Sequence, residues 1–255
     1  MPTAQIVAFY ERIAPALVPF LTGRRVALRQ VFDGQVVFRR HDDAGAWIRI
    51  PDRHALVAWV QRDAQAFFPE LVGDDGALWF ALDIDRRHRP LAEAATVAGA
   101  ICAVLDALEL PYLLKFSGED GFHVLWSFGP VSAAAFAPRT AWAFERAVVE
   151  ALRERAETHL VSAGLPSPAT TCDARDRARA DLVLIDALIL HDKATIRAPY
   201  SLHEGSGLVS VPLAPTALAG FVPQHDAVPE MVVAQGGSLP VTAPARVHER
   251  LLTSG

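Results

Sequence analysis

Hydrophobic and polar residues follow two different periods along this chain, one typical of helices and one typical of strands. Apolar residues recur every three or four positions over 6–20, 56–67, 97–108 and 138–160, which predicts four amphipathic helices. Short apolar runs predict strands over 25–31, 35–40, 47–50, 78–85, 112–116, 122–128, 182–186, 195–198 and 208–211. Asp33 and Gly34, between the first two strands, are a strong hairpin signal. After residue 213, proline, glycine and alanine dominate, so we expect a loop-rich tail with one short helix near 245–252.

Two carboxylates end the apolar strand predicted over residues 78–85. Side chains two positions apart in a strand lie on the same face, so Asp83 and Asp85 are expected to project together. Paired carboxylates repel each other unless a cation lies between them, and oxygen ligands suit Mg²⁺ or Mn²⁺. Taken alone, the pattern fits a strand that runs out into solvent equally well.

A glycine-containing loop with a serine and a histidine follows between two predicted strands. It reads Ser117-Gly118-x-x-Gly121-x-His123. Two glycines allow a tight turn whose backbone N–H groups can face an anion, and the hydroxyl and imidazole add further donors. This set suits a polyphosphate, although ordinary hairpin turns use the same residues and a lone strand histidine is more often structural.

A third group begins with another carboxylate at the end of an apolar strand, Asp186. Downstream, Arg197 and His203 flank a turn whose conformation is restricted by Pro199, and both can donate hydrogen bonds to an anion. In isolation, this segment also reads as a surface turn with an incidental arginine and histidine.

Composition limits the class of protein. The net charge of −5 excludes a general basic field for nucleic acid, although local arginine clusters could bind phosphates. Only Cys102 and Cys172 are cysteines, which indicates neither a disulfide framework nor a zinc knuckle. No apolar run approaches the roughly 18 residues of a membrane span, and the N-terminus lacks a signal pattern. We therefore expect a soluble cytoplasmic protein that does not bind membranes.

Taken in order, the three groups resemble the motifs of the archaeo-eukaryotic primase superfamily. Segment 196–213 is similar to the small catalytic primase subunit, in which a basic residue and proline precede Ser-x-His, glycine and Ser-Val-Pro. Segments 9–25 and 221–228 are similar to the superfamily as well, the former to the polymerase domain of bacterial end-joining DNA ligases. The resemblance covers about residues 5–230.

The resemblance implies a metal-dependent nucleotidyltransferase that extends a nucleic-acid 3′-OH on a template. Two divalent ions, Mn²⁺ or Mg²⁺ and not zinc, would be held by Asp83, Asp85 and Asp186. The residues implied to bind the incoming nucleoside triphosphate are Lys115, Ser117, His123, Arg197 and His203. A separate ligase, helicase or end-binding protein is a further expected partner, besides the DNA template and primer.

One departure from the family pattern bears on nucleotide binding. Glu119 and Asp120 occupy the loop positions where the family usually has a Lys or Arg before the second glycine. Two carboxylates beside a triphosphate would be repulsive unless they point to solvent, bind metal or meet compensating arginines. This departure supports an alternative, a catalytically silent relative that binds nucleic acid or a replication or repair partner. A phosphatase with an Asp-x-Asp nucleophile strand is a weaker reading, because Arg86 and Arg87 follow where that chemistry wants Thr.

The expected fold is α+β, a primase-type catalytic core with mixed sheets in two packed lobes around an active-site cleft. We expect one catalytic domain over residues 1–230, with an N-terminal αβ lobe over about 1–75, and a loop-rich tail over 231–255.

Overall fold

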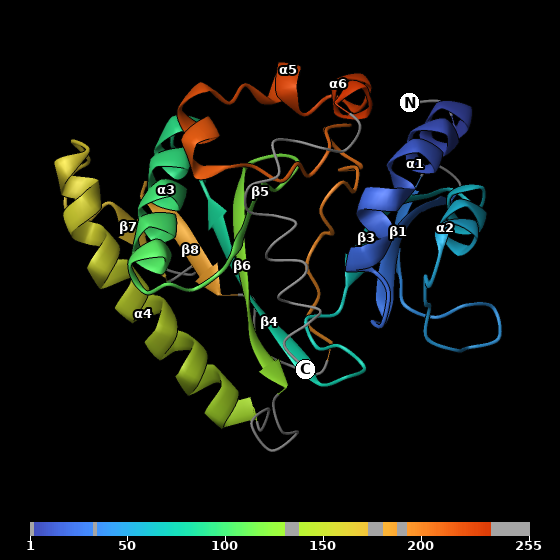
Figure 1. Ribbon diagram of the computed structural model, residues 1–255, viewed down its shortest axis with the longest axis horizontal. Helices are drawn as coiled ribbons and strands as arrows, with labels where there is room; N and C mark the ends of the chain where they lie inside the picture. The colour runs from blue at the N-terminus through green and yellow to red at the C-terminus, as the bar shows by residue number, and fades with distance from the viewer. Residues whose placement is uncertain (1–2, 33–34, 131–137, 173–180, 188–192, 236–255) are drawn as a thin grey trace.

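The computed structural model describes residues 3–32, 35–130, 138–172, 181–187 and 193–235. Its fold is α+β, as predicted, and contains two sheets. A three-stranded sheet with two helices forms the N-terminal lobe, and a five-stranded sheet with two longer helices forms the central lobe (Figure 1). No helix in these ranges is long and apolar enough to cross a membrane.

The N-terminal lobe is an antiparallel sheet with strand order β2-β1-β3. Its elements are α1 Thr3–Leu17, η1 Val18–Phe20, β1 Val26–Phe32, β2 Gln35–Arg39, α2 Arg53–Val60 and β3 Ala64–Pro69. The predicted hairpin is confirmed, since Leu28 to Phe32 pair with the strand that follows. The rings of Tyr10 and Phe67 meet edge to face at 5.1 Å between centroids, which fixes α1 on the sheet.

The central lobe has strand order β5-β6-β4-β8-β7, antiparallel except for the β7–β8 pair. Its strands are β4 Ala77–Asp85, β5 Leu113–Phe116, β6 Gly121–Pro130, β7 Thr170–Thr171 and β8 Val183–Ala187. Helices α3 Leu91–Ala107 and α4 Pro138–Ser162 lie side by side against this sheet (Figure 1). Leu82 and Ile84 are fully buried in the core, whereas Asp83 and Asp85 are only partly buried.

Residues 195–212 connect the two sheets. The amide of Ala198 donates to the carbonyl of Phe67 in β3, and the amide of Phe116 in β5 donates to the carbonyl of Val211, both at 2.8 Å. The hydroxyl of Tyr10 accepts from the amide of Leu202 at 3.0 Å. This segment is therefore hydrogen-bonded to both lobes.

The secondary structure corrects several predictions. Residues 64–69 form β3 and do not continue the second helix, because α2 ends at Val60 and Asp63 adopts a left-handed backbone with φ 64°. Segments 47–50, 195–198 and 208–211 form only isolated bridges, such as Leu202 with Val209. Pro199 and Pro212, which have no N–H to donate, limit continuous pairing at the ends of the last two of these segments.

The region after residue 213 is more helical than expected. It forms η4 Pro215–Gly220, α5 Pro223–Asp226 and α6 Pro229–Ala234. Each begins with a proline, whose missing N–H costs nothing at the first helical position. Helix α6 crosses the expected boundary at residue 230 and buries Val232. The helix predicted near 245–252 lies outside the described residues.

Candidate active site

A row of four polar side chains crosses the central sheet from β8 to β5. Asp186 lies directly opposite Asp83, which lies opposite His123, which lies opposite Lys115. Directly opposed residues in antiparallel strands share a face, with Cα atoms about 4.5–5.5 Å apart. Strand pairing thus brings together residues that are up to 103 positions apart in the sequence, since 186 − 83 = 103.

Carboxylates occupy one end of this row. Asp85 follows Asp83 on the same face of β4. Burial and the neighbouring charge of Asp83 both raise the pKa of Asp186. Among the described residues, no three His, Cys, Asp or Glu side chains are already arranged as a finished metal site. The two facing carboxylates nevertheless fit a divalent cation chemically, because a cation between them would relieve the repulsion that raises this pKa.

His123 holds the centre of the row. Its Nε2 lies 3.3 Å from Oδ1 of Asp83, whose side chain is 39% exposed at the pocket wall. Burial lowers the pKa of His123 to about 4, and Lys115 adds to that effect, so the imidazole is neutral at neutral pH. Burial acts to raise the pKa of Asp83, but His123 and Lys115 outweigh it, so the net pKa is lowered and this carboxylate is ionised.

The serine–glycine loop approaches the strand ends closely. A Cβ on Gly121 would lie 2.0 Å from the carbonyl oxygen of Ile84, and one on Gly118, which has φ 105°, would lie 2.9 Å from Cβ of His203. Only glycine fits at either position. The Ser117 hydroxyl oxygen accepts from the amide of Gly121 at 3.1 Å, which leaves its hydrogen as the donor.

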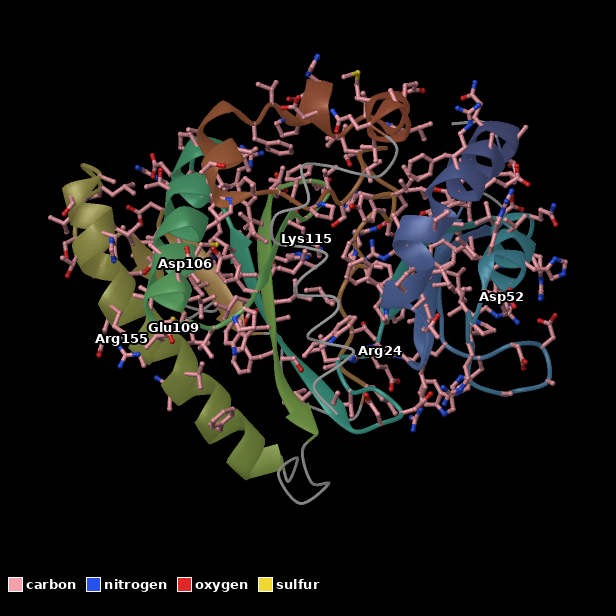
Figure 2. All side chains as sticks on the ribbon, in the orientation of Figure 1. Arg24, Asp52, Asp106, Glu109, Lys115 and Arg155 are labelled. Carbon is pink, nitrogen blue, oxygen red and sulfur yellow. The ribbon has the colours of Figure 1, made fainter. Side chains whose placement is uncertain are left out.

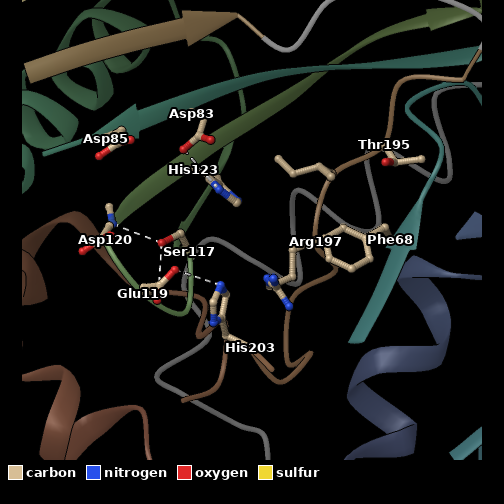
Figure 3. Close-up of a pocket in the computed structure, with 12 residues that line it drawn as sticks. Phe68, Asp83, Asp85, Ser117, Glu119, Asp120, His123, Thr195, Arg197 and His203 are labelled. Carbon is tan, nitrogen blue, oxygen red and sulfur yellow. Dashed lines mark hydrogen bonds and ion pairs between the residues drawn. The ribbon is translucent and has the colours of Figure 1, made fainter. Parts of the chain in front are cut away.

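The two loop carboxylates that depart from the family pattern both have hydrogen-bond partners, and Asp120 is paired with an arginine. Arg86 donates to Oδ1 of Asp120 from Nε at 3.0 Å and from a terminal nitrogen at 2.8 Å. Glu119 lies 3.1 Å from Nε2 of His203 (Figure 3). Arg86 directly follows Asp85 and is therefore one of the compensating arginines that the sequence suggested.

His203 is held in one orientation by backbone donors. Its Nδ1 accepts from the amides of Gly205 and Ser206, both at 3.2 Å. Its Nε2 therefore carries the proton and donates to Glu119. Burial, followed by the charges of Arg197 and Arg29, lowers the pKa of His203 to about 4, so this contact joins a neutral imidazole to a carboxylate.

Arg197 is paired with the buried side chain of Glu204, which no sequence motif marked. It donates to the carbonyl of Leu202 at 2.6 Å and to Glu204 at 3.1 Å, and Glu204 also pairs with Arg29. Burial and the charge of Arg29 lower the pKa of Arg197 to about 10. The guanidinium lies over the ring of Phe68, 4.7 Å from its centroid.

These residues surround a pocket of about 300 Å³ between the lobes (Figure 3). It is lined by Phe68, Asp83, Asp85, Ser117, Glu119, Asp120, Gly121, His123, Thr195, Ile196, Arg197 and His203. Asp186 is beside Asp83 in the sheet but is not part of this lining, and Lys115 is fully buried behind His123. Phe68 and Thr195 were missed because the sequence placed the first at a helix end and the second outside the recognised motifs.

Comparison with known proteins gives a family and a fold. The family model described as "LigD, primase-polymerase domain" matches residues 36–236. The polymerase domain of Mycobacterium tuberculosis Ligase D, solved in complex with DNA, is similar in structure, with a TM-score of 0.72 and 18% sequence identity. The alignment covers 96% of this chain and 92% of the mycobacterial one. A search of curated proteins finds no match.

Proposed function

Because this chain belongs to the family of LigD primase-polymerase domains, we propose that it is a template-directed nucleotidyltransferase. It would add nucleotides, NTPs or dNTPs, to the 3′-OH of a nucleic-acid primer or a first nucleotide, in priming, gap filling or end-joining repair. The observation that carries the proposal is the pocket in which Asp83 and Asp85 face the hydrogen-bond donors of Ser117, His123, Arg197 and His203, with Asp186 directly beside Asp83.

The three carboxylates are assigned to divalent ions, Mg²⁺ or Mn²⁺. When bound, such ions lower the pKa of the attacking hydroxyl and neutralise charge on the transferred phosphoryl group. Asp83 and Asp186 would contribute oxygens from adjacent strands, and Asp85 would add another from the same face of β4. Rigid strands position these oxygens, as a phosphoryl transfer that depends on positioning and electrostatics requires.

The opposite wall of the pocket is assigned to the triphosphate. Ser117 can donate its hydroxyl hydrogen, and Arg197 carries a positive charge. His123 and His203 each direct an Nε2 toward the pocket, where it now meets a carboxylate. A triphosphate offers the same acceptor chemistry as those carboxylates and would compete with Glu119 for His203.

Nucleic acid is the expected partner. The similar mycobacterial domain was solved with DNA, which supports a DNA template and primer for this chain. A net charge of −5 means that contacts to phosphates depend on local arginines and not on a general field. A separate ligase, helicase or end-binding protein would supply the other steps of repair or replication.

The catalytically silent alternative has one supporting observation. Arg197 and His203 are both paired with carboxylates from this chain, Glu204 and Glu119. If these two pairs stayed closed, a triphosphate could not reach Arg197 and His203, and the protein would bind nucleic acid without extending it.

Extension of a labelled primer on a DNA template tests the proposal, with Mn²⁺ or Mg²⁺ and with each nucleotide type. We expect extension by the natural chain and none by Asp83→Asn. Asp43→Asn is the matched control, because Asp43 forms an exposed pair with Arg39 and Arg62 on the N-terminal lobe. A gel shift without extension would support the silent alternative, and release of phosphate without a template would indicate a phosphatase.

A further inference from the structure

We propose that Lys115 is a positioning residue that fixes the tautomer of His123, so that its Nε2–H is the nitrogen presented to the pocket. The catalytic benefit of this arrangement depends on the proposed function. We infer this indirect role in place of the direct contact with the nucleotide that the family resemblance implied for Lys115. The juxtaposition that supports it is a buried lysine directly behind an imidazole that faces Asp83.

Lys115 has no exposed surface, and its side chain is among the largest fully buried ones of the described residues. Figure 2 labels its position on the ribbon. It lies opposite His123 in the β5–β6 pair, and its Nζ contacts Nδ1 of that ring. The second contact of Nζ is Oγ of Ser210, at 2.9 Å. Lys115 therefore reaches the pocket only through His123.

The direction of each hydrogen bond is determined by its neighbours. Ser210 donates its one hydroxyl hydrogen to the carbonyl of Phe116, at 2.7 Å. Its oxygen is then an acceptor for Lys115. A protonated Nζ has hydrogens and no lone pair, so in that state it also donates to Nδ1 of His123. At the other side of the ring, an ionised Asp83 can only accept. Both neighbours of His123 therefore favour a neutral ring with the proton on Nε2.

The second pocket histidine reaches the same state by another route. His203 accepts at Nδ1 from two backbone amides, so its Nε2 also carries the proton. Within the described part of the chain, no backbone amide donates to Nδ1 of His123, because its position within β6 commits the nearby amides to sheet pairing. A buried lysine supplies the missing donor there.

The wrong tautomer would be costly at this position. With the proton on Nδ1, the lone pair of Nε2 would face the carboxylate of Asp83, and the triphosphate would lose a donor. An orienting partner of this kind commonly contributes 10–100-fold to affinity or activity at metal sites, about the range expected here. Burying an amine is expensive, so stability alone does not account for a lysine at this position.

The first test is the tautomer of His123 in the full chain labelled with ¹⁵N-histidine, without metal, nucleotide or DNA. Long-range ¹H–¹⁵N correlation spectra distinguish the two tautomers, and the missing signal in His123→Gln assigns the ring. We expect the Nε2–H form in the natural chain. An Nδ1–H form would overturn the proposal, whether or not the protein polymerises.

The second test removes the donor. Lys115→Met keeps length without an amine, and Lys193→Met, at the only other lysine, is the matched control. We expect a measurable Nδ1–H population in Lys115→Met, because Asp83 alone then favours the Nε2–H form, with kcat/KM for the triphosphate lowered about 10–100-fold and the fold retained. A folded Lys115→Met protein with the Nε2–H form alone, as in the natural chain, would overturn the proposal.

If Lys115→Met does not fold, Ser210→Ala can be used to weaken the same series of hydrogen bonds, from His123 through Lys115 to Ser210, at its other end. It removes the acceptor of Lys115 and leaves the lysine in place. A measurable Nδ1–H population in Ser210→Ala supports the chain of donors, and an unchanged ring overturns it. If the natural chain shows the expected tautomer but does not extend a primer, the proposed polymerase activity is wrong and the tautomer assignment still holds.

Discussion

Glu204 accepts a hydrogen bond from Arg197 at 3.1 Å, and each of the two side chains is only 6% exposed. The same carboxylate pairs with Arg29 from β1, so it links the connecting segment to the N-terminal sheet. A buried carboxylate between two guanidinium groups offsets charge that would otherwise be uncompensated. It also reduces the positive charge available to a triphosphate in the pocket.

Glu204→Gln is expected to separate these two effects. Loss of the carboxylate leaves Arg29 and Arg197 in mutual repulsion, and the free energy of unfolding should fall by about 1–3 kcal/mol. The KM for the triphosphate should fall as well, because a neighbouring carboxylate no longer offsets the positive charge of Arg197. Urea denaturation and steady-state kinetics measure the two. Asp43→Asn, at an exposed pair, should change stability by less than about 1 kcal/mol, and an equal loss in both variants would contradict the role of burial.

Glu119→Gln is expected to tighten nucleotide binding. Glu119 accepts from Nε2 of His203, so a triphosphate must displace it to reach this donor. Removing the negative charge should lower the KM for the triphosphate about 2–5-fold, with kcat little changed. The effect on KM is modest because the side chain of Glu119 is 50% exposed. Asp120→Asn is the comparison, since Asp120 is already neutralised by Arg86. A higher KM in Glu119→Gln would show that this carboxylate assists binding.

Asp186→Asn is expected to stabilise the protein while abolishing extension. Burial and the charge of Asp83 raise the pKa of Asp186, so its ionised form is less favourable in the folded state than in the unfolded chain. The neutral amide should raise the free energy of unfolding at pH 7 by up to about 1 kcal/mol, since the side chain is partly exposed to solvent. Thermal unfolding in a chelating buffer measures this change. A lower midpoint would mean that the carboxylate makes stabilising contacts.

Acid should destabilise the protein through His203. The folded pKa of about 4 lies below the ordinary value of 6.5, so the unfolded chain binds the proton more readily. The contribution to stability is complete above about pH 6.5, and is lost progressively as the pH falls toward 4. His203→Gln should flatten this part of the profile by about 1–3 kcal/mol relative to the natural chain. Denaturation series at pH 7.5, 6, 5 and 4 would show parallel curves if the ring were not shifted.

The motifs were predictable because strand ends are local patterns. Apolar runs that stop at Asp83 and Asp186 identified both strands, and the α+β fold and family resemblance are confirmed. The register that sets these two residues opposite each other depends on pairing between strands about 100 residues apart, which no local pattern specifies.

Other parts of the site depend on tertiary context. The segment 64–69 has apolar spacing compatible with a helix, but pairing with β1 makes it a strand and brings Phe68 to the pocket. Glu204 and Ser210 read as ordinary turn and strand residues. Their partners, Arg29 and Lys115, lie on strands that only the fold brings near.

The segment over residues 195–212 has a mechanical consequence. Arg197 and His203 lie on a strap that is tied to β3 at one end and to β5 at the other. The aspartates, in contrast, belong to the central sheet alone. Any rotation of one lobe against the other would move this segment relative to the aspartates, so it would change the spacing between the residues proposed to bind the triphosphate and those proposed to bind the metal ions.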